Sequence, residues 1–457
     1  MEVAQSSLKV DTSLKGIILL TLPISMAKLI PELNYLFNAA FLGHMGSREL
    51  ALAGITGVYY LVFSAVGYGL NNALLSIMSR RAGEDNRNEI FSSLWHGVVL
   101  GWLLAAIFTL FTWLSVRPLM TWAGVEPEGA SMASGFLDIR MLGLFFLFTL
   151  QMQNAFLISV QQTRYLILIA VVQSVVNVTL DYGLIFGNLG FTAMGFNGAA
   201  VASVISELVG MMTVFLVIKN LKIKERFNIQ SVYTLYMSKL KLVLKQGFPL
   251  MSQLAISTGA WWLFFVLVSR NYTYEDQAIS QTMRNLFGLG GVFSWAFGSS
   301  ANTILSNLIG QGRQEEIFGI IRRLVLISMI GMSVLMAIIN IYPSLFLGLF
   351  GQPEAFIEQG LPTLRIVSAA MIIVCAGVIW LNAVVATGRT TVVFWIEFWG
   401  IAGYLAYVWV VIEVMKLSLE AAWMSEWIYW ITMLVLSYLY LRFGNWRQHL
   451  AFEDDAK

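Results

Sequence analysis

The sequence predicts an all-α integral membrane protein with 12 transmembrane helices in two parallel six-helix repeats. The first observation is composition, since 58% of the 457 residues are hydrophobic, only 12% are charged, and the mean hydropathy is +0.73. Soluble domains carry roughly 25% charged residues. The second is length, because a helical span needs about 20 apolar residues and the chain has room for about a dozen. The third is an internal duplication.

The two halves of the chain match each other at a shift of 225 to 227 residues. Pro23 in LLTLPISM corresponds to Pro249 in QGFPLMSQ, 226 residues later. Further matching pairs are Glu89 with Glu316, Pro127 with Pro353, Arg140 with Arg365, and Arg164 with Arg389. A constant shift of this size indicates a duplicated six-helix unit with few insertions. Membrane proteins made of two such repeats commonly work at the cleft between them, so the duplication favours transport.

Apolar runs place the spans in order along both halves. Several are longer than the minimum, which implies tilt or extension beyond the bilayer. The predicted spans are residues 16–43, 50–79, 90–115, 132–160, 165–187, 197–218, 247–270, 278–307, 317–346, 357–386, 391–415 and 421–442. We therefore expect an N-terminal lobe at 15–218 and a C-terminal lobe at 246–443. The remaining segments are a basic linker at 219–245, a short N-terminal segment at 1–14 and a tail at 444–457.

The distribution of Lys and Arg predicts the orientation. With the N-terminus inside, only Arg48, Arg117, Arg270 and Lys416 fall on the outer side, whereas the linker and the other inner loops collect the remaining loop Lys and Arg residues. Both termini are then cytoplasmic, and the first span serves as the insertion signal, since residues 1–14 hold no cleavable signal. Because both halves start on the same side, the repeats are parallel. We expect a multi-pass protein of the cytoplasmic (inner) membrane.

Composition also limits cofactors and partners. The single cysteine, Cys375, excludes an internal disulfide, and three scattered histidines give no metal motif. We expect no organic cofactor and no bound metal centre. The expected partners are small organic substrates and membrane lipid, without nucleic acid, and the expected state is a monomer. The basic linker could recognise anionic lipid, or it could simply tether the lobes.

Three acids lie deep in predicted spans, Glu32, Asp181 and Glu207, and Asp181 is the strongest candidate for a functional site among them. Asn177 precedes it by four residues and shares its helix face. Ionisable groups in the bilayer are costly and are usually paired or cavity-facing. The pair could bind a proton or share a small cation, or Asp181 could only hydrogen-bond another helix.

Lys28 and Glu32 in KLIPE have the same four-residue spacing, and Pro31 frees a carbonyl beside them. They form either an ion pair or a proton site controlled by the lysine. Glu207 has no partner on its own helix, so we expect it to hydrogen-bond another span. Arg140 and Arg365 occupy matching positions, which favours a structural role. Glu397, two turns inside its span, is a weaker candidate.

Polar side chains inside other spans suggest a substrate pocket. Together with aromatic side chains such as Trp261 and Phe265, they would suit large amphipathic cations through cation–π attraction. Aromatic residues are, however, also common on lipid-facing surfaces. The candidate substrate-binding residues are Asn34, Asn154, Gln253, Ser257, Gln281 and Arg284.

Several segments resemble the multidrug and toxic compound extrusion (MATE) family of the flippase-like superfamily. They include LFNAAFLGHMGSRELALAGI at 36–55, VEPEGASMASGFLDIRMLGLFF at 125–146 and NVTLDYGLIFG at 177–187. GFNGAAVASVIS at 195–206, LVLKQGFPL at 242–250 and LSNLIGQGRQEEI at 305–317 complete the match. The likeness covers nearly the whole chain. It implies two six-helix lobes arranged as a V around a central cavity, with alternating access coupled to proton or sodium entry.

The chain departs from the family pattern at the expected coupling residues. Asn38 stands where many bacterial members have an Asp, and an amide cannot carry a coupling proton. Ser257 and Val374 replace acids that other members have in spans seven and ten, and Ala199 replaces a threonine. A sodium site would retain few oxygen ligands. The resemblance therefore implies proton coupling through Asp181, helped by Glu32, in the N-terminal lobe.

Three functions remain open at this point. The first is a MATE-type multidrug efflux antiporter for amphipathic, cationic organic compounds. The second is a flippase for lipid or lipid-linked substrates, or an uncoupled facilitator, which the lost acids favour. The third is a membrane enzyme or receptor, for which the sequence holds no catalytic motif.

Overall fold

The computed structural model describes residues 8–45, 47–122, 126–220, 222–229, 233–347 and 354–447. Some side chains within these helices, including those of residues 33–40, lie outside the described set. The described residues form helices joined by short loops, and none of them lies in a β-strand. The protein is thus all-α over the described part of the chain, as the composition predicts.

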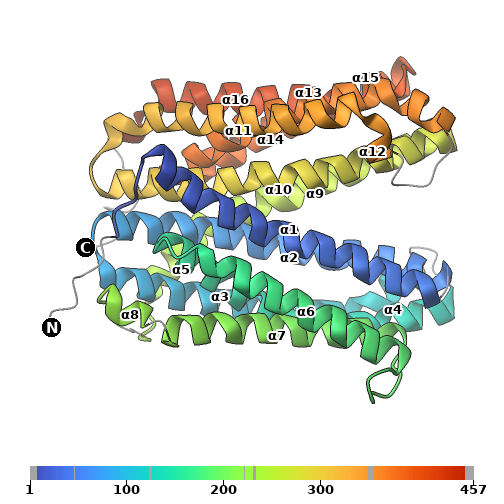
Figure 1. Ribbon diagram of the computed structural model, residues 1–457, viewed down its shortest axis with the longest axis horizontal. Helices are drawn as coiled ribbons and strands as arrows, with labels where there is room; N and C mark the ends of the chain where they lie inside the picture. The colour runs from blue at the N-terminus through green and yellow to red at the C-terminus, as the bar shows by residue number, and fades with distance from the viewer. Residues whose placement is uncertain are drawn as a thin grey trace. The chain divides into compact units, whose positions relative to one another are not determined.

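The long helices match the predicted spans in order (Figure 1). In the first half they are α1 (Leu14–Met45), α2 (Ser47–Gly83), α3 (Arg87–Trp122), α4 (Pro127–Arg140), α5 (Gly143–Ser159), α6 (Arg164–Phe186) and α7 (Phe196–Asn220). In the second half they are α9 (Met237–Asn271), α10 (Tyr274–Gly310), α11 (Ile317–Ile341), α13 (Glu354–Ala386), α14 (Thr390–Trp409) and α16 (Ser425–Phe443). Short helices α8 (Ile223–Arg226), α12 (Pro343–Leu347) and α15 (Leu419–Trp423) connect them.

Length and apolarity support a membrane location for most of these helices. Nine of those in the described part of the chain are long and apolar enough to cross a membrane, and the bent pair α4–α5 makes a tenth. The fourth span, predicted as one helix, is bent by 43° between α4 and α5. At the bend the backbone N–H groups of Leu142 and Leu144 bond to the carbonyls three residues back, which tightens the turn.

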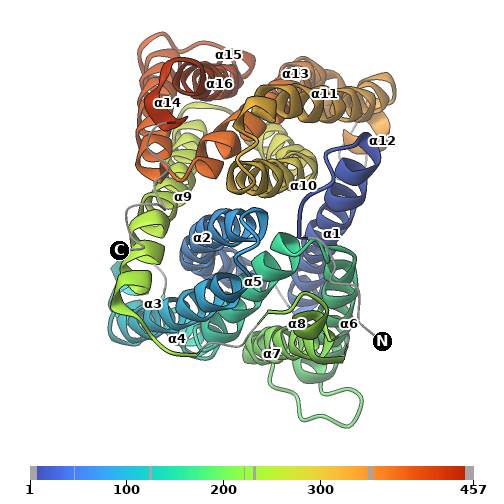
Figure 2. The ribbon, with the colours of Figure 1, turned by 90° about the vertical axis from the view of Figure 1, so that its left-hand side faces the viewer.

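The chain divides into two compact units. The first consists of Met1–Val10 and Leu22–Met251, and the second of Asp11–Thr21 and Ser252–Lys457. In the first unit α5 is central and packs against α2, α3 and α7, and α6 packs on α7. In the second unit α13 packs in the same way against α10, α11 and α16, and α14 packs on α16. Figure 2 looks along the helices of each unit. Equivalent helices therefore pair equivalently, as expected of a duplication.

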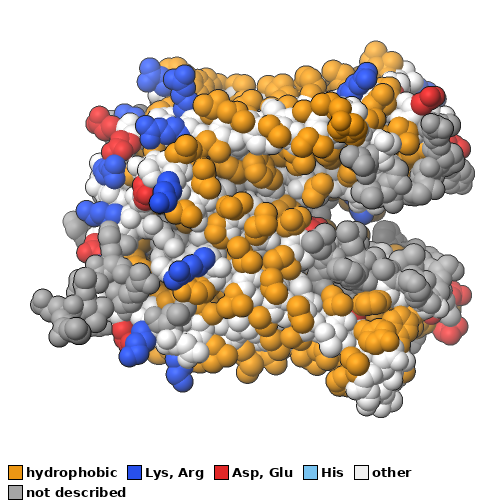
Figure 3. All heavy atoms as spheres, viewed as in Figure 1, with side chains coloured by type: hydrophobic (Ala, Val, Ile, Leu, Met, Phe, Trp, Pro, Cys, Tyr) orange, Lys and Arg blue, Asp and Glu red, His pale blue; other side chains and the backbone are white. Residues whose placement is uncertain are grey.

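Apolar side chains point outward from the units in stripes. On α11 Leu326, Ile330 and Val334, spaced four residues apart, are each more than half exposed. On α6 Leu168, Val171 and Val175 are likewise exposed. Hydrophobic side chains cover most of the face that Figure 3 shows over these helices. A helix that is apolar on its exposed face as well as its packed face requires lipid around it.

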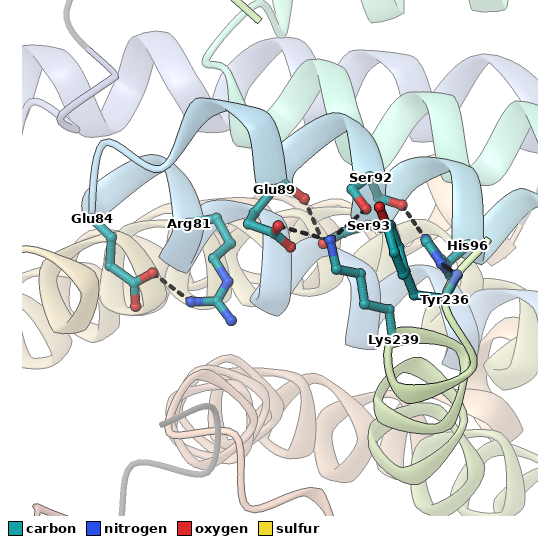
Figure 4. Close-up of polar contacts among 8 residues, drawn as sticks. All are labelled: Arg81, Glu84, Glu89, Ser92, Ser93, His96, Tyr236 and Lys239. Carbon is teal, nitrogen blue, oxygen red and sulfur yellow. Dashed lines mark hydrogen bonds and ion pairs between the residues drawn. The ribbon is translucent and has the colours of Figure 1, made fainter. Parts of the chain in front are cut away.

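The start of α9 is docked on α3 within the first unit (Figure 4). Lys239 Nζ donates hydrogen bonds to Glu89 Oε1 at 2.7 Å and to Ser92 Oγ at 3.0 Å. The Tyr236 backbone N–H donates to Nε2 of the buried His96 at 2.9 Å, and His96 Nδ1 lies 2.7 Å from the Ser92 carbonyl oxygen. Because Nε2 accepts, Nδ1 carries the hydrogen and the ring is neutral. The end of the predicted linker is therefore helix that belongs to the first unit.

The Glu89–Lys239 ion pair is expected to add little to stability. Its side chains are 30% and 28% exposed, so solvent screens the attraction, and such pairs contribute about 0.2–1 kcal/mol. A double-mutant cycle with Glu89→Gln and Lys239→Gln, read from thermal unfolding in detergent micelles, should give a coupling in that range. A much larger coupling would show that this docking holds the unit together.

Candidate ion-coupling and substrate-binding sites

Asp181 and Asn177 lie buried on α6 in the first unit. Asp181 is 0% exposed and Asn177 2%. One turn further, α7 approaches the backbone of α6 so closely that a Cβ on Gly198 would lie 2.7 Å from the Leu184 carbonyl oxygen. Only glycine permits this close packing of α7 on α6. The two residues that the sequence singled out are thus enclosed in protein.

A bidentate ion pair lies near Asp181. Arg140 of α4 donates from Nη1 to Glu207 Oε2 at 2.8 Å and from Nη2 to Oε1 at 2.6 Å. The Tyr60 hydroxyl donates to Glu207 Oε1 at 3.2 Å, and the Arg140 guanidinium carbon lies 3.7 Å from the centroid of the Tyr60 ring. The Arg140 charge also acts on the Asp181 carboxylate. The expected hydrogen bonding of Glu207 to another span is confirmed.

Gly143 makes room for this ion pair at the bend between α4 and α5. A Cβ at that position would lie 2.3 Å from Glu207 Oε2 and 2.6 Å from Arg140 Nη1. The repeat-related Arg365 is exposed on α13, so the two matching arginines have different environments. The two arginines match in sequence, but only Arg140 is held in a buried ion pair with a glutamate among the described residues.

The remaining coupling candidates of the first unit lie on α1. Lys28 is half-buried, with its Nζ 5.5 Å from the centroid of the Tyr68 ring, and Glu32 is exposed. The side chains of Asn34 and Asn38 lie outside the described residues. On α1 the structure therefore informs the interpretation of Lys28 and Glu32 only.

The other substrate-binding candidates are spread over both units. Asn154 of α5 is half-buried, and its Oδ1 has no hydrogen-bond partner among the described residues. Gln281 is exposed on α10, and the half-buried Arg284 has its guanidinium carbon 6.0 Å from the centroid of the Phe265 ring. Gln253 and Ser257 are the two candidates that the structure brings together with an acid.

That acid is Glu397 of α14, in the second unit. Gln253 of α9 donates from Nε2 to Glu397 Oε2 at 3.1 Å, and the Tyr429 hydroxyl of α16 donates to Glu397 Oε1. Ser257 Oγ lies 3.4 Å from the Tyr429 hydroxyl oxygen. Glu397 itself is 1% exposed.

A second buried acid, Glu426 of α16, lies in the same unit. The Trp261 indole of α9 donates to Glu426 Oε1 at 3.1 Å, and the Trp430 indole donates to Oε2 at 3.2 Å. Glu426 lies near the start of the last predicted span, where an acid is not unusual, so it is not among the residues predicted from the sequence. The signal available was spacing, because Gln253, Ser257 and Trp261 follow one another every four residues and so form one stripe on α9.

Acids buried in two equivalent bundles of apolar helices are typical of secondary transporters, which keep ionisable groups within the membrane for coupling. The sequence model of the MatE family matches residues 23–183 and 249–407. The two matched segments start at the two repeat-related prolines. The chain therefore belongs to the MatE family, and it is a multi-pass membrane transporter rather than an enzyme.

Similar proteins agree with this assignment over the full length. The chain is 25% identical over 442 residues to a probable multidrug resistance protein NorM of Thermotoga maritima, covering 95% of this chain and 93% of that protein. It is also 25% identical over 277 residues, 60% of its length, to a probable NorM protein of Bacillus anthracis.

Solved structures show the same fold. An outward-facing multidrug resistance MATE transporter of the MOP superfamily superimposes with a TM-score of 0.86 at 17% identity, covering 98% of both chains. A MOP-superfamily transporter from Pyrococcus furiosus gives 0.84 at 16% identity and the same coverage. The predicted fold class, two parallel repeats of six membrane helices, is confirmed.

Proposed function

We propose that the protein exports amphipathic organic cations by alternating access, in exchange for protons that bind Asp181. The observation that carries the proposal is the complete burial of this carboxylate on α6. A carboxylate enclosed among membrane helices is costly to keep ionised. We therefore expect Asp181 to bind a proton in one conformation of the transport cycle and release it in another. The curated relatives are named multidrug resistance proteins, which supports organic substrates.

Proton coupling fits better than sodium coupling. A sodium ion needs several oxygen ligands with enough negative charge. Val374 and Ala199 stand where the family resemblance leads us to expect an acid and a threonine, so fewer such oxygens are available. Gln253 and Ser257 would contribute to substrate binding from the second unit. On the distribution of Lys and Arg we place both termini on the cytoplasmic side of the cytoplasmic membrane, and we propose that the protein acts as a monomer.

Transport by purified protein in proteoliposomes tests the proposal. A fluorescent lipophilic cation such as ethidium should move in exchange for protons when a pH gradient is imposed at equal sodium on both sides. A sodium gradient at fixed pH should drive no transport. Sodium-driven movement without a pH gradient would reject the proton assignment, and movement of a fluorescent phospholipid instead of the cation would favour a flippase.

Glu32→Gln is expected to shift the pH dependence of transport towards lower pH. If Glu32 helps Asp181 to bind a proton, as the sequence suggests, its negative charge favours proton binding, and its removal means that a higher proton concentration is needed. The affinity for the organic cation should change less than the pH profile. Transport rates measured between pH 5.5 and 8.5 on a series of external buffers (about three units, enough to cover a one-proton titration) check this. An unchanged profile would leave Glu32 with a structural role.

A further inference from the structure

We propose that the second unit carries its own proton-binding site, formed by Glu397 of α14 and Glu426 of α16. The inference rests on the proposed function in so far as the bound protons serve transport, but the site itself can be tested without transport. It adds a second location for protons to the one at Asp181, in a different unit and on different helices.

Neither carboxylate has a cationic partner in the described part of the second unit. Glu397 is 1% exposed and Glu426 is 5% exposed, and no Lys or Arg among the described residues acts on either one. In the first unit Glu207 is equally buried, but Arg140 neutralises it. An isolated buried carboxylate is costly, and the usual remedy in the absence of a counter-ion is to take up a proton. Glu207 can therefore stay ionised beside Arg140, whereas Glu426 has only neutral partners among the described residues.

The partners of Glu397 can serve both of its protonation states. When Glu397 is ionised, Gln253 and the Tyr429 hydroxyl donate to its two oxygens. A tyrosine hydroxyl can also accept, so a proton on Glu397 can point at Tyr429. The Tyr429 hydrogen then turns towards Ser257 Oγ, which lies 3.4 Å away. This exchange of roles requires rotation of one hydroxyl hydrogen and no movement of the backbone.

Glu426 needs a different acceptor, because its two indole partners can only donate. Tyr404 of α14 supplies one. Tyr404 is 3% exposed, and it interacts with the Glu426 carboxylate and with the hydroxyl of Ser425, the residue before Glu426. Ser425 is 0% exposed. Both hydroxyls can accept as well as donate, so the site holds acceptors that a proton on Glu426 would use.

The ligand that fits is a proton rather than a metal or an organic cation. The oxygens of both acids face donor hydrogens from an amide, a phenol and two indoles, and these would repel a metal ion. The other titratable groups that face the acids are Tyr404 and Tyr429, whose ring centroids are 6.0 Å apart, and Tyr429 interacts with both carboxylates. Both acids are enclosed, which leaves their oxygens inaccessible to a large cation.

Infrared difference spectroscopy of the full-length protein in lipid, titrated with protons, tests the site directly. A protonated carboxylic acid has a carbonyl band that ionisation removes. We expect Glu397→Gln and Glu426→Gln each to lose one such titrating band, and the double variant to lose both. Glu358→Gln, a change of an exposed acid on α13, is the matched control and should keep both bands. If neither single variant loses a band, the proposal is wrong.

Tyr404→Phe provides a second measurement that leaves both acids in place. Loss of its hydroxyl removes the proposed acceptor, so the Glu426 band should shift in frequency while the Glu397 band stays. An unshifted Glu426 band would overturn the role of Tyr404 and, with it, the account of how Glu426 holds a proton. In Asp181→Asn both bands should persist, so a failure of proton-coupled transport and a failure of this site give different results.

Discussion

Asp181→Asn is expected to abolish the accumulation of an organic cation driven by a pH gradient. Asparagine retains the size and polarity of aspartate but cannot bind a proton at physiological pH. A gradient of one pH unit supplies about 1.4 kcal/mol for each proton, which supports about a tenfold concentration ratio of a substrate exchanged one for one. In the variant this ratio should fall to one. The measurement is the steady-state accumulation of ethidium in proteoliposomes.

Two comparisons make that result interpretable. Asp85→Asn changes an exposed acid in the loop after α2, where Asp85 pairs with Arg87, and it should leave the ratio unchanged because exposed pairs contribute little. Binding of ethidium without a gradient should survive in Asp181→Asn, since the substitution removes a proton site and not the pocket. Undiminished accumulation by Asp181→Asn would reject Asp181 as the coupling residue.

Breaking the Arg140–Glu207 pair is expected to give the largest loss of stability. Glu207→Leu leaves the Arg140 guanidinium buried without its counter-ion, and removal of one partner of a buried pair costs about 3–5 kcal/mol. The side chains are 13% and 5% exposed, so water cannot replace the lost partner. Thermal unfolding in detergent micelles, followed by tryptophan fluorescence, should show a clearly lower midpoint for this variant.

The double variant Arg140→Met/Glu207→Leu is the decisive comparison. Replacing both charges by apolar side chains removes the ionic attraction and the cost of desolvating the charges together, and such replacements are often neutral or stabilising. The double variant should therefore unfold at a higher temperature than Glu207→Leu alone. A double variant that unfolds no higher than Glu207→Leu would mean that the ionic attraction stabilises the unit by more than desolvation of the two charges costs. Strictly additive losses would mean that the two residues do not interact.

The sequence predicts the fold well because lipid imposes a strong pattern. The predicted spans at 165–187 and 197–218 correspond closely to α6 (Arg164–Phe186) and α7 (Phe196–Asn220). Breaks inside a span are harder to predict. The predicted span 317–346 ends early, at Ile341, and Pro343 then starts α12, a stop that proline signals. The bend before Gly143 has no proline to signal it, and the ion pair beside it joins residues 67 positions apart, which no local pattern reveals.

The candidate site is predictable only where its members share a helix. Asn177 and Asp181 are one turn apart, so their spacing identifies them. Glu426 could not be predicted because its partner Trp261 is 165 positions away on another helix. An acid near the end of a predicted span is also usually expected to face water. The positions equivalent to Asn177 and Asp181 in the second repeat are Ala402 and Ala406, so the sequence favours the N-terminal lobe as the place of coupling. The structure places the acids of the second repeat at other positions of the equivalent helices.

The division into units has a consequence for expressing the halves separately. The boundaries fall inside α1, between Thr21 and Leu22, and inside α9, between Met251 and Ser252. Thr21 Oγ1 donates to the Ser300 hydroxyl at 2.8 Å within the second unit, and Lys239 is tied to Glu89 in the first. A chain cut at residue 231 would give fragments that each lack a packed segment supplied by the other. Functional reconstitution from two such fragments would therefore require their co-synthesis, and neither fragment is an autonomous module despite the duplication.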